Sequence, residues 1–562
     1  MKQWKRTLCL VPAACGMVLV GYPNGNLSAN QSANVPSAVN SATTASANTV
    51  MTLGIDNGSP DFTENFNPFS PNLRSGTYFI YETLYAINAQ NGTQTPWLAS
   101  SFKWNGTKQL TFTIRKGIKW NDGKTFSSSD VAFTFNLLKK YPALDTSSVW
   151  SVLSSVAAPN ATTVVFKFKT AAIPIFTYIC NTPIVPEHIW KNVSNPVTYT
   201  NTNPVGTGAF KLSSYTNTQY VLTKNTGYWK ASKVVATQLI FPVLTGNDTS
   251  DLNLASGKYT WANLFVPNIE KTYVDRDKAD NHYWFAPGGP SNLVMNLTKA
   301  PFNNAVFRQA MEYAINKQEV SAKGEYGYQP PANATGLMLP GQQSWLNPSL
   351  KNAYAYNPKK AAQLLASIGY KKNSKGQLVN KSGKPVAFTI TVPGDYTDWI
   401  QSCKVIAQNL AQLGITLNLQ TPSDTGWYNQ LQTGDYDMSL TYGVNYNNPW
   451  FYYDSVLSSA NTAPIGKAAS SNFERWKNLA TDKLLTEFEQ TTSPTVQHKV
   501  INQLQETMIK QVPLIPLFYN ANWNEYSTAD FVGWPDASNP YATPDFLFND
   551  NELIMTHLKL AH

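Results

Sequence analysis

The chain has 562 residues, a formal net charge of +9, and 42% hydrophobic but only 14% charged residues. This length is several times the usual domain size of roughly 100–200 residues and predicts more than one lobe, while the hydrophobic content excludes disorder throughout. No run of five lysines or arginines occurs, so the positive charge does not indicate a nucleic-acid-binding protein.

Neutral polar residues take the place of the missing charged ones, because Ser, Thr, Asn and Gln are abundant throughout the chain. Such a surface stays soluble without relying on ionised carboxylates. One hypothesis is therefore an acidic external habitat, where carboxylates would be protonated. Stability that persists below about pH 4 would support this hypothesis, and acid unfolding near that pH would reject it.

The N-terminal segment, residues 1–21, has the features of a secretory signal. It begins with Lys2, Lys5 and Arg6 and continues as a mostly apolar run over residues 8–20. That run is too short for a membrane-spanning helix, which needs about 20 residues. We expect the chain to be exported and to act outside the cytoplasm.

Residues 22–49 are rich in Asn, Ser and Ala and lack hydrophobic periodicity, which predicts a flexible tether. A tether directly after an export signal indicates association with the cell surface. Tyr22, however, stands where a lipoprotein signal would place its acylated cysteine, and Cys15 follows a triplet that begins with Pro12. A membrane-anchored and a secreted protein therefore both remain open as alternatives.

The two cysteines beyond the leader are predicted to be separate buried thiols. Cys403 lies at a core-facing position of an expected helix, and Cys180 lies in an apolar stretch. Two such cysteines make a poor disulfide framework.

Local patterns in the first half predict strands packed with a helix. Leu110, Phe112 and Ile114 alternate as in a strand, and residues 162–170 predict a second strand that pairs with the first. Ser127 followed by Asp130 resembles a capping box and predicts a helix that begins there. The segment NPVGTGAFKL predicts a tight bend before a strand, because it lacks the Lys-Ser/Thr of a phosphate loop.

The second half alternates between helical and strand patterns. Helices are expected at residues 303–317, 356–370 and 400–414, and strands at residues 386–392, 415–420 and 512–519. Asn357, Pro358 and Gly369 supply the start and stop signals of the second of these helices. The strand–helix–strand order predicts a right-handed parallel unit and an α/β lobe.

Catalytic and metal-binding motifs are missing from the sequence. The five histidines show no metal-ligand spacing, and no G-x-S-x-G motif occurs. Asp435 and Asp437 lie two residues apart on an expected strand and could form a glycosidase pair, but a solvated strand edge is the commoner interpretation. We therefore expect no enzyme, no metal and no cofactor.

Aromatic residues are the positive signal, at 13% of the chain with 16 Trp and 29 Tyr. Most of them belong to the core, but some lie at the ends of expected elements, where rings suit the wall of a binding cleft and amides fix a ligand's orientation. The segment TYGVNYNNPW combines rings and amides with no charge. The candidate ligand-binding residues are Asn445, Tyr446, Trp450, Tyr442, Trp427, Trp284 and Asn67.

Several ordered blocks carry a resemblance to a known family. They include LTFTIRKGIKWNDGKTFSSSDVAFTF, NPVGTGAFKLSSY, APFNNAVFRQAMEYAINK, YNPKKAAQLLASIGY, GDYDMSL and VPLIPLFY. From about residue 50 to its C-terminus the chain resembles the extracytoplasmic solute-binding proteins of ABC importers, in the oligopeptide, dipeptide and nickel class called family 5.

The resemblance implies an α/β, two-lobed, type II periplasmic-binding-protein-like fold with an extra inserted subdomain. It implies a monomer whose lobes close on the ligand by hinge motion and whose partners are ABC permease subunits in the membrane. The first lobe would comprise residues 50–95, 200–297 and 523–562, the inserted subdomain residues 96–199, and the second lobe residues 298–522.

The resemblance also bears on the ligand. In the peptide-binding members, the loop after the GDYDM strand carries an aspartate that pairs with the peptide's α-ammonium group, and Asn445 occupies this position here. A neutral amide cannot form that charge-assisted bond, which is about twice as strong as a neutral one. Residues 139–150 and 325–337 are similar to oligosaccharide-binding members. These features favour an oligosaccharide over an oligopeptide, with Asp424 or Asp454 as alternative ammonium contacts.

Two other classes of function remain as alternatives. A surface carbohydrate-binding adhesin would deliver no cargo, and permease and ATPase genes beside its own gene would exclude it. A glycoside hydrolase would turn over the oligosaccharide, and intact recovery of the bound sugar would exclude it.

Overall fold

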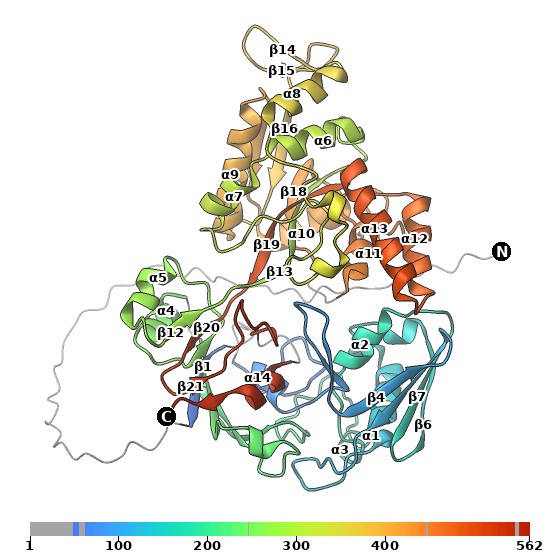
Figure 1. Ribbon diagram of the computed structural model, residues 1–562, viewed down its shortest axis with the longest axis vertical. Coiled ribbons are helices and arrows are strands. Elements are labelled where there is room, and N and C mark those ends of the chain that lie inside the picture. Colours follow the sequence, from blue (N-terminus) through green and yellow to red (C-terminus); the bar gives the residue numbers. More distant parts are fainter. Residues whose placement is uncertain (1–48, 56–61, 245–246, 445–447, 546–549) are drawn as a thin grey trace, which may run out of the picture.

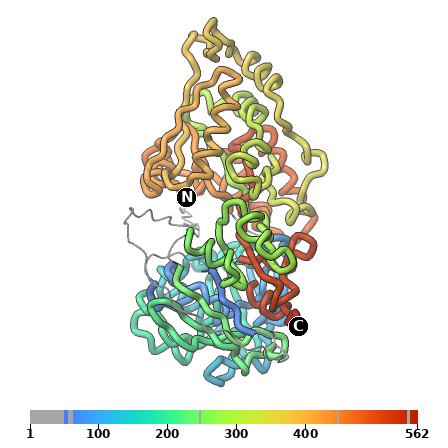
Figure 2. Tube along the Cα trace, turned by 90° about the vertical axis from the view of Figure 1, so that its left-hand side faces the viewer, coloured from blue at the N-terminus to red at the C-terminus, as the bar shows by residue number. Residues whose placement is uncertain are grey.

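The computed structural model describes residues 49–55, 62–244, 247–444, 448–545 and 550–562. The expected signal segment, residues 1–21, and nearly all of the expected tether, residues 22–49, lie outside this part of the chain. The described residues form an α/β fold with two lobes, one above the other in Figure 1 and in the turned view of Figure 2. The α/β, two-lobed fold predicted from the sequence is confirmed.

The lower lobe is built on a seven-stranded sheet in the order β12-β20-β11-β1-β10-β9-β8. Strands β1, β10, β11 and β12 run in the same direction, and β9 and β20 run against them. The strands are β1 (Val50–Gly54), β8 (Phe210–Tyr215), β9 (Gln219–Lys224), β10 (Gln238–Pro242), β11 (Trp261–Ala262), β12 (Asn281–Tyr283) and β20 (Glu525–Ser527). Helices α4 (Asn247–Ala255), α5 (Ile269–Thr272) and α14 (Asn551–His557) and the short strands β2 (Tyr85–Ile87), β3 (Gln94–Pro96), β21 (Phe531–Val532) and β22 (Lys559–Leu560) complete it.

A glycine allows the expected tight bend before β8. A Cβ atom at Gly206 would overlap the carbonyl oxygen of Ile80, so only a residue without a side chain fits here. The bend therefore brings the chain back into the lower lobe through close backbone packing.

A four-stranded antiparallel sheet, β4-β5-β7-β6, forms the inserted subdomain beside the lower lobe. The predicted pairing of β5 with β7 is confirmed, and so is the capping box of Ser127 and Asp130 at the start of α1. Contacts also reach the upper lobe, because the Ile173 amide donates to the Glu489 carbonyl at 3.0 Å. The elements are β4 (Ala99–Trp104), β5 (Gln109–Ile114), β6 (Leu153–Asn160), β7 (Thr163–Phe168), α1 (Ser128–Lys140), α2 (Ile175–Asn181) and α3 (Glu187–Trp190).

The upper lobe is built on a five-stranded sheet in the order β17-β16-β18-β13-β19. The predicted parallel pairing of β16 with β17 is confirmed, as is Asn357 as the N-cap of α8. The strands are β13 (Ala286–Met295), β16 (Ala387–Thr391), β17 (Thr416–Gln420), β18 (Met438–Thr441) and β19 (Leu514–Asn522), with β14 (Lys371–Lys372) and β15 (Leu378–Val379) at the top. The helices are α6 (Ala305–Ala314), α7 (Lys317–Gly324), α8 (Pro358–Ser367), α9 (Thr397–Ala411), α10 (Asp424–Thr433), α11 (Pro449–Leu457), α12 (Leu479–Glu489) and α13 (Pro494–Gln511).

Strands β13 and β19 connect the two lobes as a neighbouring antiparallel pair. β13 follows β12 of the lower sheet after two residues, and β19 continues into β20 of the lower sheet after two residues. β13 pairs within the upper sheet, although the sequence placed residues up to 297 in the first lobe. The Gly- and Pro-rich start of β13 hides its strand character in the sequence. We propose the lobe boundaries stated above with one change, which is that β13 belongs to the second lobe.

Cys180 and Cys403 are separate buried thiols, as predicted. Their environments explain this, because Cys180 packs in the inserted subdomain and Cys403 in α9 of the upper lobe. Burial raises the pKa of the Cys180 thiol well above its usual value, so this thiol is unreactive.

A buried carboxyl, Glu82, holds together parts of the lower lobe that are far apart in the sequence. Its Oε1 accepts hydrogen bonds from Trp97 Nε1 at 2.6 Å, Tyr228 Oη at 3.0 Å and Trp229 Nε1 at 3.1 Å. Glu552 of α14 is buried nearby and accepts from the Ala209 amide at 3.1 Å. Neither Glu82 nor Glu552 takes part in any ion pair among the described residues.

Burial raises the pKa of the Glu82 carboxyl, and burial together with the Glu82 charge raises the pKa of Glu552. The same cause raises the pKa of Glu474 and of Glu325 to about 8 and that of Asp550 to about 7. A carboxyl whose pKa is higher in the folded than in the unfolded chain binds its proton more tightly when folded. Its contribution to stability is complete below the unfolded pKa, about 4.3, and is lost as the pH rises through the folded pKa.

We therefore expect the protein to be more stable at pH 5 than at pH 8, with the midpoint of urea unfolding as the measurement. The variant Glu552→Gln mimics the protonated carboxyl and should raise the midpoint at pH 8 more than at pH 5. Glu506→Gln, at a carboxyl on the outer face of α13 that pairs with Lys510, is the control and should not flatten the pH dependence. A higher midpoint at pH 8 than at pH 5 in the unaltered protein would contradict the prediction.

Candidate ligand-binding site

The carboxyl ends of the parallel strands in the upper lobe point toward the lower lobe. β13 enters the upper sheet from the lower lobe, and β18 runs antiparallel to it, so β18 ends near the crossing. β16 is parallel to β18, and β17 is parallel to β16. The loops that follow these strands therefore share one edge. In open α/β sheets, ligands bind outside the carboxyl ends of the strands.

The carboxyl ends of strands in the lower lobe point toward the upper lobe in the same way. β12 leads directly into β13, and β11 and β1 run parallel to β12 within the lower sheet. Phe265 follows β11, Trp284 and Phe285 follow β12, and Trp523 precedes the antiparallel β20. The two edges therefore meet on either side of the crossing strands, and we call them the lower and upper interlobe edges.

Half-buried rings gather at the lower interlobe edge. The ring centroids of Phe285 and Trp523 lie 4.7 Å apart, and those of Phe265 and Trp523 lie 5.4 Å apart. Tyr328 packs 5.3 Å from Phe285, and its hydroxyl accepts from the Ile269 amide at 3.1 Å. Loop 326–328 of the upper lobe thus rests on the lower lobe, close to the crossing.

The upper interlobe edge combines tyrosine rings with a carboxylate. Tyr442 follows β18, is 45% exposed and packs 4.6 Å from Trp399. Tyr396 follows β16, and its ring centroid lies 6.2 Å from that of Tyr442. Burial raises the pKa of the Tyr396 hydroxyl, and the Asp424 charge adds to this shift. Asp424 is exposed in the first turn of α10, after β17.

Neither edge carries a lysine or arginine in its described segments, which are residues 263–266, 284–290, 392–397, 421–428, 442–444 and 523–524. Their only ionisable groups of either sign, tyrosines aside, are Asp395 and Asp424. These segments therefore offer no cationic side chain to an anionic ligand.

Two of the seven sequence-predicted site residues have accessible side chains at these edges. Tyr442 is at the upper edge, as described. Trp284 is half-buried at the lower edge, and its amide donates to the Asn524 carbonyl at 2.9 Å across the strands that lead into the crossing. Asn445 and Tyr446 lie outside the described residues.

The other three predicted site residues lie inside the protein, where each has internal partners. The Trp450 indole is 7% exposed and donates to the Leu485 carbonyl at 3.1 Å. Trp427 is 4% exposed and donates to Ser439 Oγ at 3.0 Å. Asn67 is 1% exposed and donates to the carbonyls of Pro196 and Tyr199 at 3.0 and 2.8 Å. Trp427 nevertheless belongs to the aromatic group beneath the upper edge, because its ring centroid lies 5.9 Å from that of Trp399, on which Tyr442 packs. Within the described part of the chain, Trp450 and Asn67 have no such contact with Tyr442 or Trp284.

Sequence reasoning missed Phe265, Trp523 and Tyr396 as candidates and named Asp424 only as an alternative, whereas Phe285 was already indicated as a ring at the end of an element beside Trp284. The available signal was positional, since each of these residues lies within five residues of the end of a strand in one of the two sheets. That signal becomes informative only when the direction of each strand is known.

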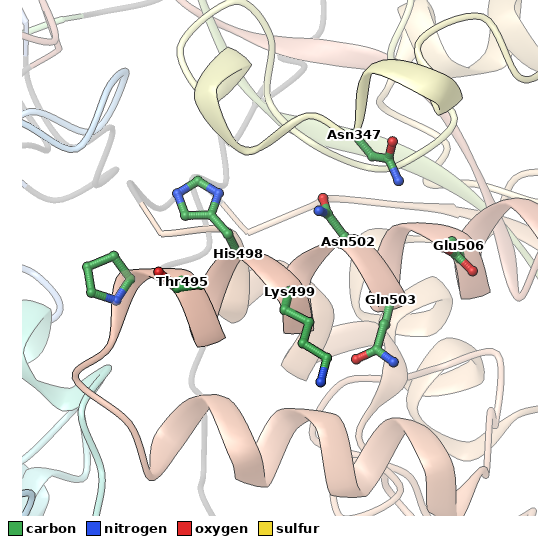
Figure 3. Close-up of a pocket in the computed structure, with 8 residues that line it drawn as sticks. Asn347, Thr495, His498, Lys499, Asn502, Gln503 and Glu506 are labelled. Carbon is green, nitrogen blue, oxygen red and sulfur yellow. The ribbon is translucent and has the colours of Figure 1, made fainter.

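Two surface grooves lie elsewhere in the upper lobe. One, of about 670 Å³, lies along α13 beside Asn347, and its polar lining includes His498, Lys499 and Asn502 (Figure 3). The other, of about 450 Å³, lies along α12. Neither groove includes a residue of the interlobe edges.

Among the described residues, no group of His, Cys, Asp and Glu side chains is arranged to hold a metal ion. In the same part of the chain no helix combines the length and apolar character needed to cross a membrane.

The fold and its opposed strand edges define the class of two-lobed binding proteins, and comparisons of the sequence identify the family. The family described as bacterial extracellular solute-binding proteins, family 5 Middle, matches residues 93–464. A Brucella ovis protein described as an ABC transporter peptide-binding protein is 30% identical over 407 residues, which are 67% of this chain and 70% of that protein. The chain belongs to the family 5 extracellular solute-binding proteins, which are the substrate-binding components of ABC transporters.

Solved structures agree with this assignment. A periplasmic oligopeptide-binding protein of Thermotoga maritima is 27% identical, with a TM-score of 0.81 over 91% of this chain and 99% of that one. The mannohexaose-bound structure of the same Thermotoga protein is 28% identical in its alignment, with a TM-score of 0.73 over 92% of this chain and 100% of that one.

The buried hydrogen bonds of Asn67 are expected to stabilise the fold rather than to bind ligand. Asn67→Ala removes two buried hydrogen bonds between the lower lobe and the segment that returns from the inserted subdomain, and should lower the free energy of unfolding by about 1–3 kcal/mol. Ligand affinity should not change. The exposed neighbour Asn72 provides the control variant, Asn72→Ala. Weaker ligand binding at unchanged stability would instead assign Asn67 to the ligand site.

Proposed function

We propose that the protein captures an uncharged oligosaccharide between its two interlobe edges and delivers it, unaltered, from the cell surface to the permease of an ABC importer. The observation that carries the proposal is the composition of these edges. They present tyrosine, tryptophan and phenylalanine rings and contain no lysine or arginine in their described segments.

Rings and oxygen acceptors are the groups that an oligosaccharide requires. The apolar faces of sugar rings pack on aromatic side chains, and their hydroxyl groups form hydrogen bonds with carboxylates, amides and tyrosines. Trp284 and Tyr442 offer ring surface from opposite lobes, and Asp424 offers a carboxylate beside Tyr442. A ligand that spans both edges would contact all three side chains.

The Thermotoga comparisons support both the ligand class and a closing motion. That relative binds mannohexaose, and the TM-score with this chain falls from 0.81 to 0.73 in the mannohexaose-bound structure. The lower score supports a lobe arrangement here that differs from the sugar-bound one. Closure about β13 and β19 would convert one arrangement into the other.

An oligopeptide is the second candidate, and Asp424 is the observation that favours it. Its exposed carboxylate could pair with the α-ammonium group of a peptide, although Asn445 lacks the charge for that role. The Brucella relative is described as a peptide-binding protein, which agrees with this candidate.

Calorimetric titration separates the two ligand classes. The protein should bind mannohexaose or cellohexaose and should give no signal with a mixture of unmodified peptides. The bound sugar should be recovered intact, because the protein binds and releases its cargo. Tight peptide binding together with silence toward both sugars would overturn the oligosaccharide proposal.

The indole of Trp284 is expected to contribute to sugar affinity. Trp284→Ala should weaken binding of the sugar by about tenfold, which corresponds to about 1.4 kcal/mol, since an aromatic contact contributes roughly this much. Trp104→Ala serves as the control, because Trp104 is a half-buried indole in the inserted sheet, away from both interlobe edges. Equal affinities of the two variants would remove Trp284 from the site.

A further inference from the structure

The upper lobe carries a segment that lies across the crossing strands from the upper interlobe edge. The loops of that edge follow β16, β17 and β18, which lie on the β13 side of the crossing pair. Residues 330–343 lie on the β19 side, because Pro331 forms an isolated antiparallel bridge with Phe518 of β19. We call residues 330–343 the far-side segment.

Hydrogen bonds fix the far-side segment to the upper lobe. The hydroxyl of Tyr519 in β19 donates to the Leu337 carbonyl at 2.7 Å. A tight turn follows and is closed twice by Gln342, whose amide donates to the Met338 carbonyl at 2.8 Å and whose Oε1 accepts from the Met338 amide at 3.0 Å. Gly341 lies within this turn, so it moves with the upper lobe.

The surface that faces Gly341 belongs to the lower lobe. It is the turn between β2 and β3, where Asn88 Nδ2 donates to the Pro540 carbonyl at 2.7 Å. Asn88 also closes this turn, since its Oδ1 accepts from the Gln90 amide at 2.8 Å and its carbonyl accepts from the Gly92 amide at 2.9 Å. Gly341 packs so closely on the Gln90 carbonyl oxygen that a Cβ atom at Gly341 would overlap it. Two well-held turns from different lobes therefore meet at a contact that requires a glycine.

This contact contains a buried polar group without an internal partner. Gln90 is 4% exposed, and its side-chain Nε2 has no hydrogen-bond partner among the described residues. A buried unsatisfied donor costs free energy, and this cost is relieved when water reaches the donor. The contact is therefore closely packed but carries an energetic cost that separation of the two turns would remove.

We propose that the Gln90–Gly341 contact is a counter-contact, which holds the lobes open and breaks when they close on ligand. The inference rests on the proposed closure about β13 and β19. A rigid lobe that rotates about the crossing pair moves its two sides in opposite directions, so the approach of the upper interlobe edge lifts the far-side segment from the lower lobe. The counter-contact then sets ligand affinity from a distance, because it stabilises the open arrangement that competes with the ligand-bound one.

Gly341→Ala tests this role, with calorimetric titration of mannohexaose and small-angle X-ray scattering as the measurements. The added methyl group should push the two turns apart, so the variant should bind mannohexaose about threefold more tightly or better and have a smaller radius of gyration without sugar. Gly341 does not have a positive φ, so alanine adds no backbone strain of its own. Gly227→Ala is the control, because Gly227 also lacks a positive φ and a Cβ atom there would lie 3.4 Å from its nearest neighbour, Asn225 Oδ1.

Gln90→Met tests the counter-contact in the opposite direction. It keeps the length of the side chain and removes the unsatisfied donor, so the contact should become more stable and mannohexaose should bind about threefold more weakly. Gln94→Met, at an exposed position of β3 in the same hairpin, is the control and should bind as the unaltered protein does. This variant keeps the inference falsifiable if the thermal unfolding temperature shows that Gly341→Ala does not fold.

The outcomes separate the counter-contact from the function beneath it. A merely structural glycine predicts weaker or unchanged binding by Gly341→Ala with an unchanged radius of gyration, and this result would overturn the inference. Unchanged or tighter binding by Gln90→Met would overturn it as well, while sugar binding by the unaltered protein stands. If the unaltered protein binds no oligosaccharide, the proposed function fails. Scattering without sugar then still decides the inference, since a smaller radius of gyration for Gly341→Ala supports it and an unchanged one overturns it.

Discussion

The antiparallel pairing of β13 with β19 is the constraint on which the rest of the structure depends. Both strands belong to the upper sheet, and each is joined to a strand of the lower sheet by only two residues. Their register is interrupted between Pro287 and Pro290, where Gly289 approaches Val444 so closely that a Cβ atom would overlap its carbonyl oxygen. The pair therefore fixes which strand ends meet, and its interrupted register and short connections are where the proposed closure would rotate the lobes.

Some buried carboxyls of the protein are satisfied by neutral hydrogen-bond donors, just as the surface relies more on neutral polar than on charged residues. Buried carboxyls such as Glu82 and Glu525 are held by neutral donors, namely indoles, a tyrosine and a backbone amide. A buried carboxyl without a cationic partner is costly when ionised and inexpensive when protonated. This arrangement agrees with the low charged fraction of the sequence and with the hypothesis of an acidic habitat, because both features suit conditions in which carboxyls carry protons.

Much of the fold could be predicted because its signals are local. The capping box at Ser127, the N-cap at Asn357 and the alternation in residues 386–392 each depend on a few neighbouring residues, and the structure confirms each of them. A further local signal stands at the start of α11. Asn448 followed by Pro449 is a typical helix start, and it places Trp450 in the first turn of a helix rather than in an open loop.

The site was harder to predict, because its residues come from segments that only the topology brings together. Phe265, Phe285 and Trp523 are separated by up to 258 residues, the distance from 265 to 523, yet their rings pack as one group. An aromatic residue at the end of an element has two possible environments, the core or an open edge, and composition does not distinguish them. Trp427 and Trp450 belong to the first environment and Tyr442 to the second.

The distribution of rings also connects binding with closure. Each interlobe edge holds only part of a ring-lined surface, with Trp284 on one lobe and Tyr442 on the other, so neither lobe alone can enclose the proposed ligand. A ligand bound to one edge gains the contacts of the other only when the lobes approach. Its affinity for the closed arrangement must therefore exceed its affinity for the open one, and this difference is what shifts the population toward closure.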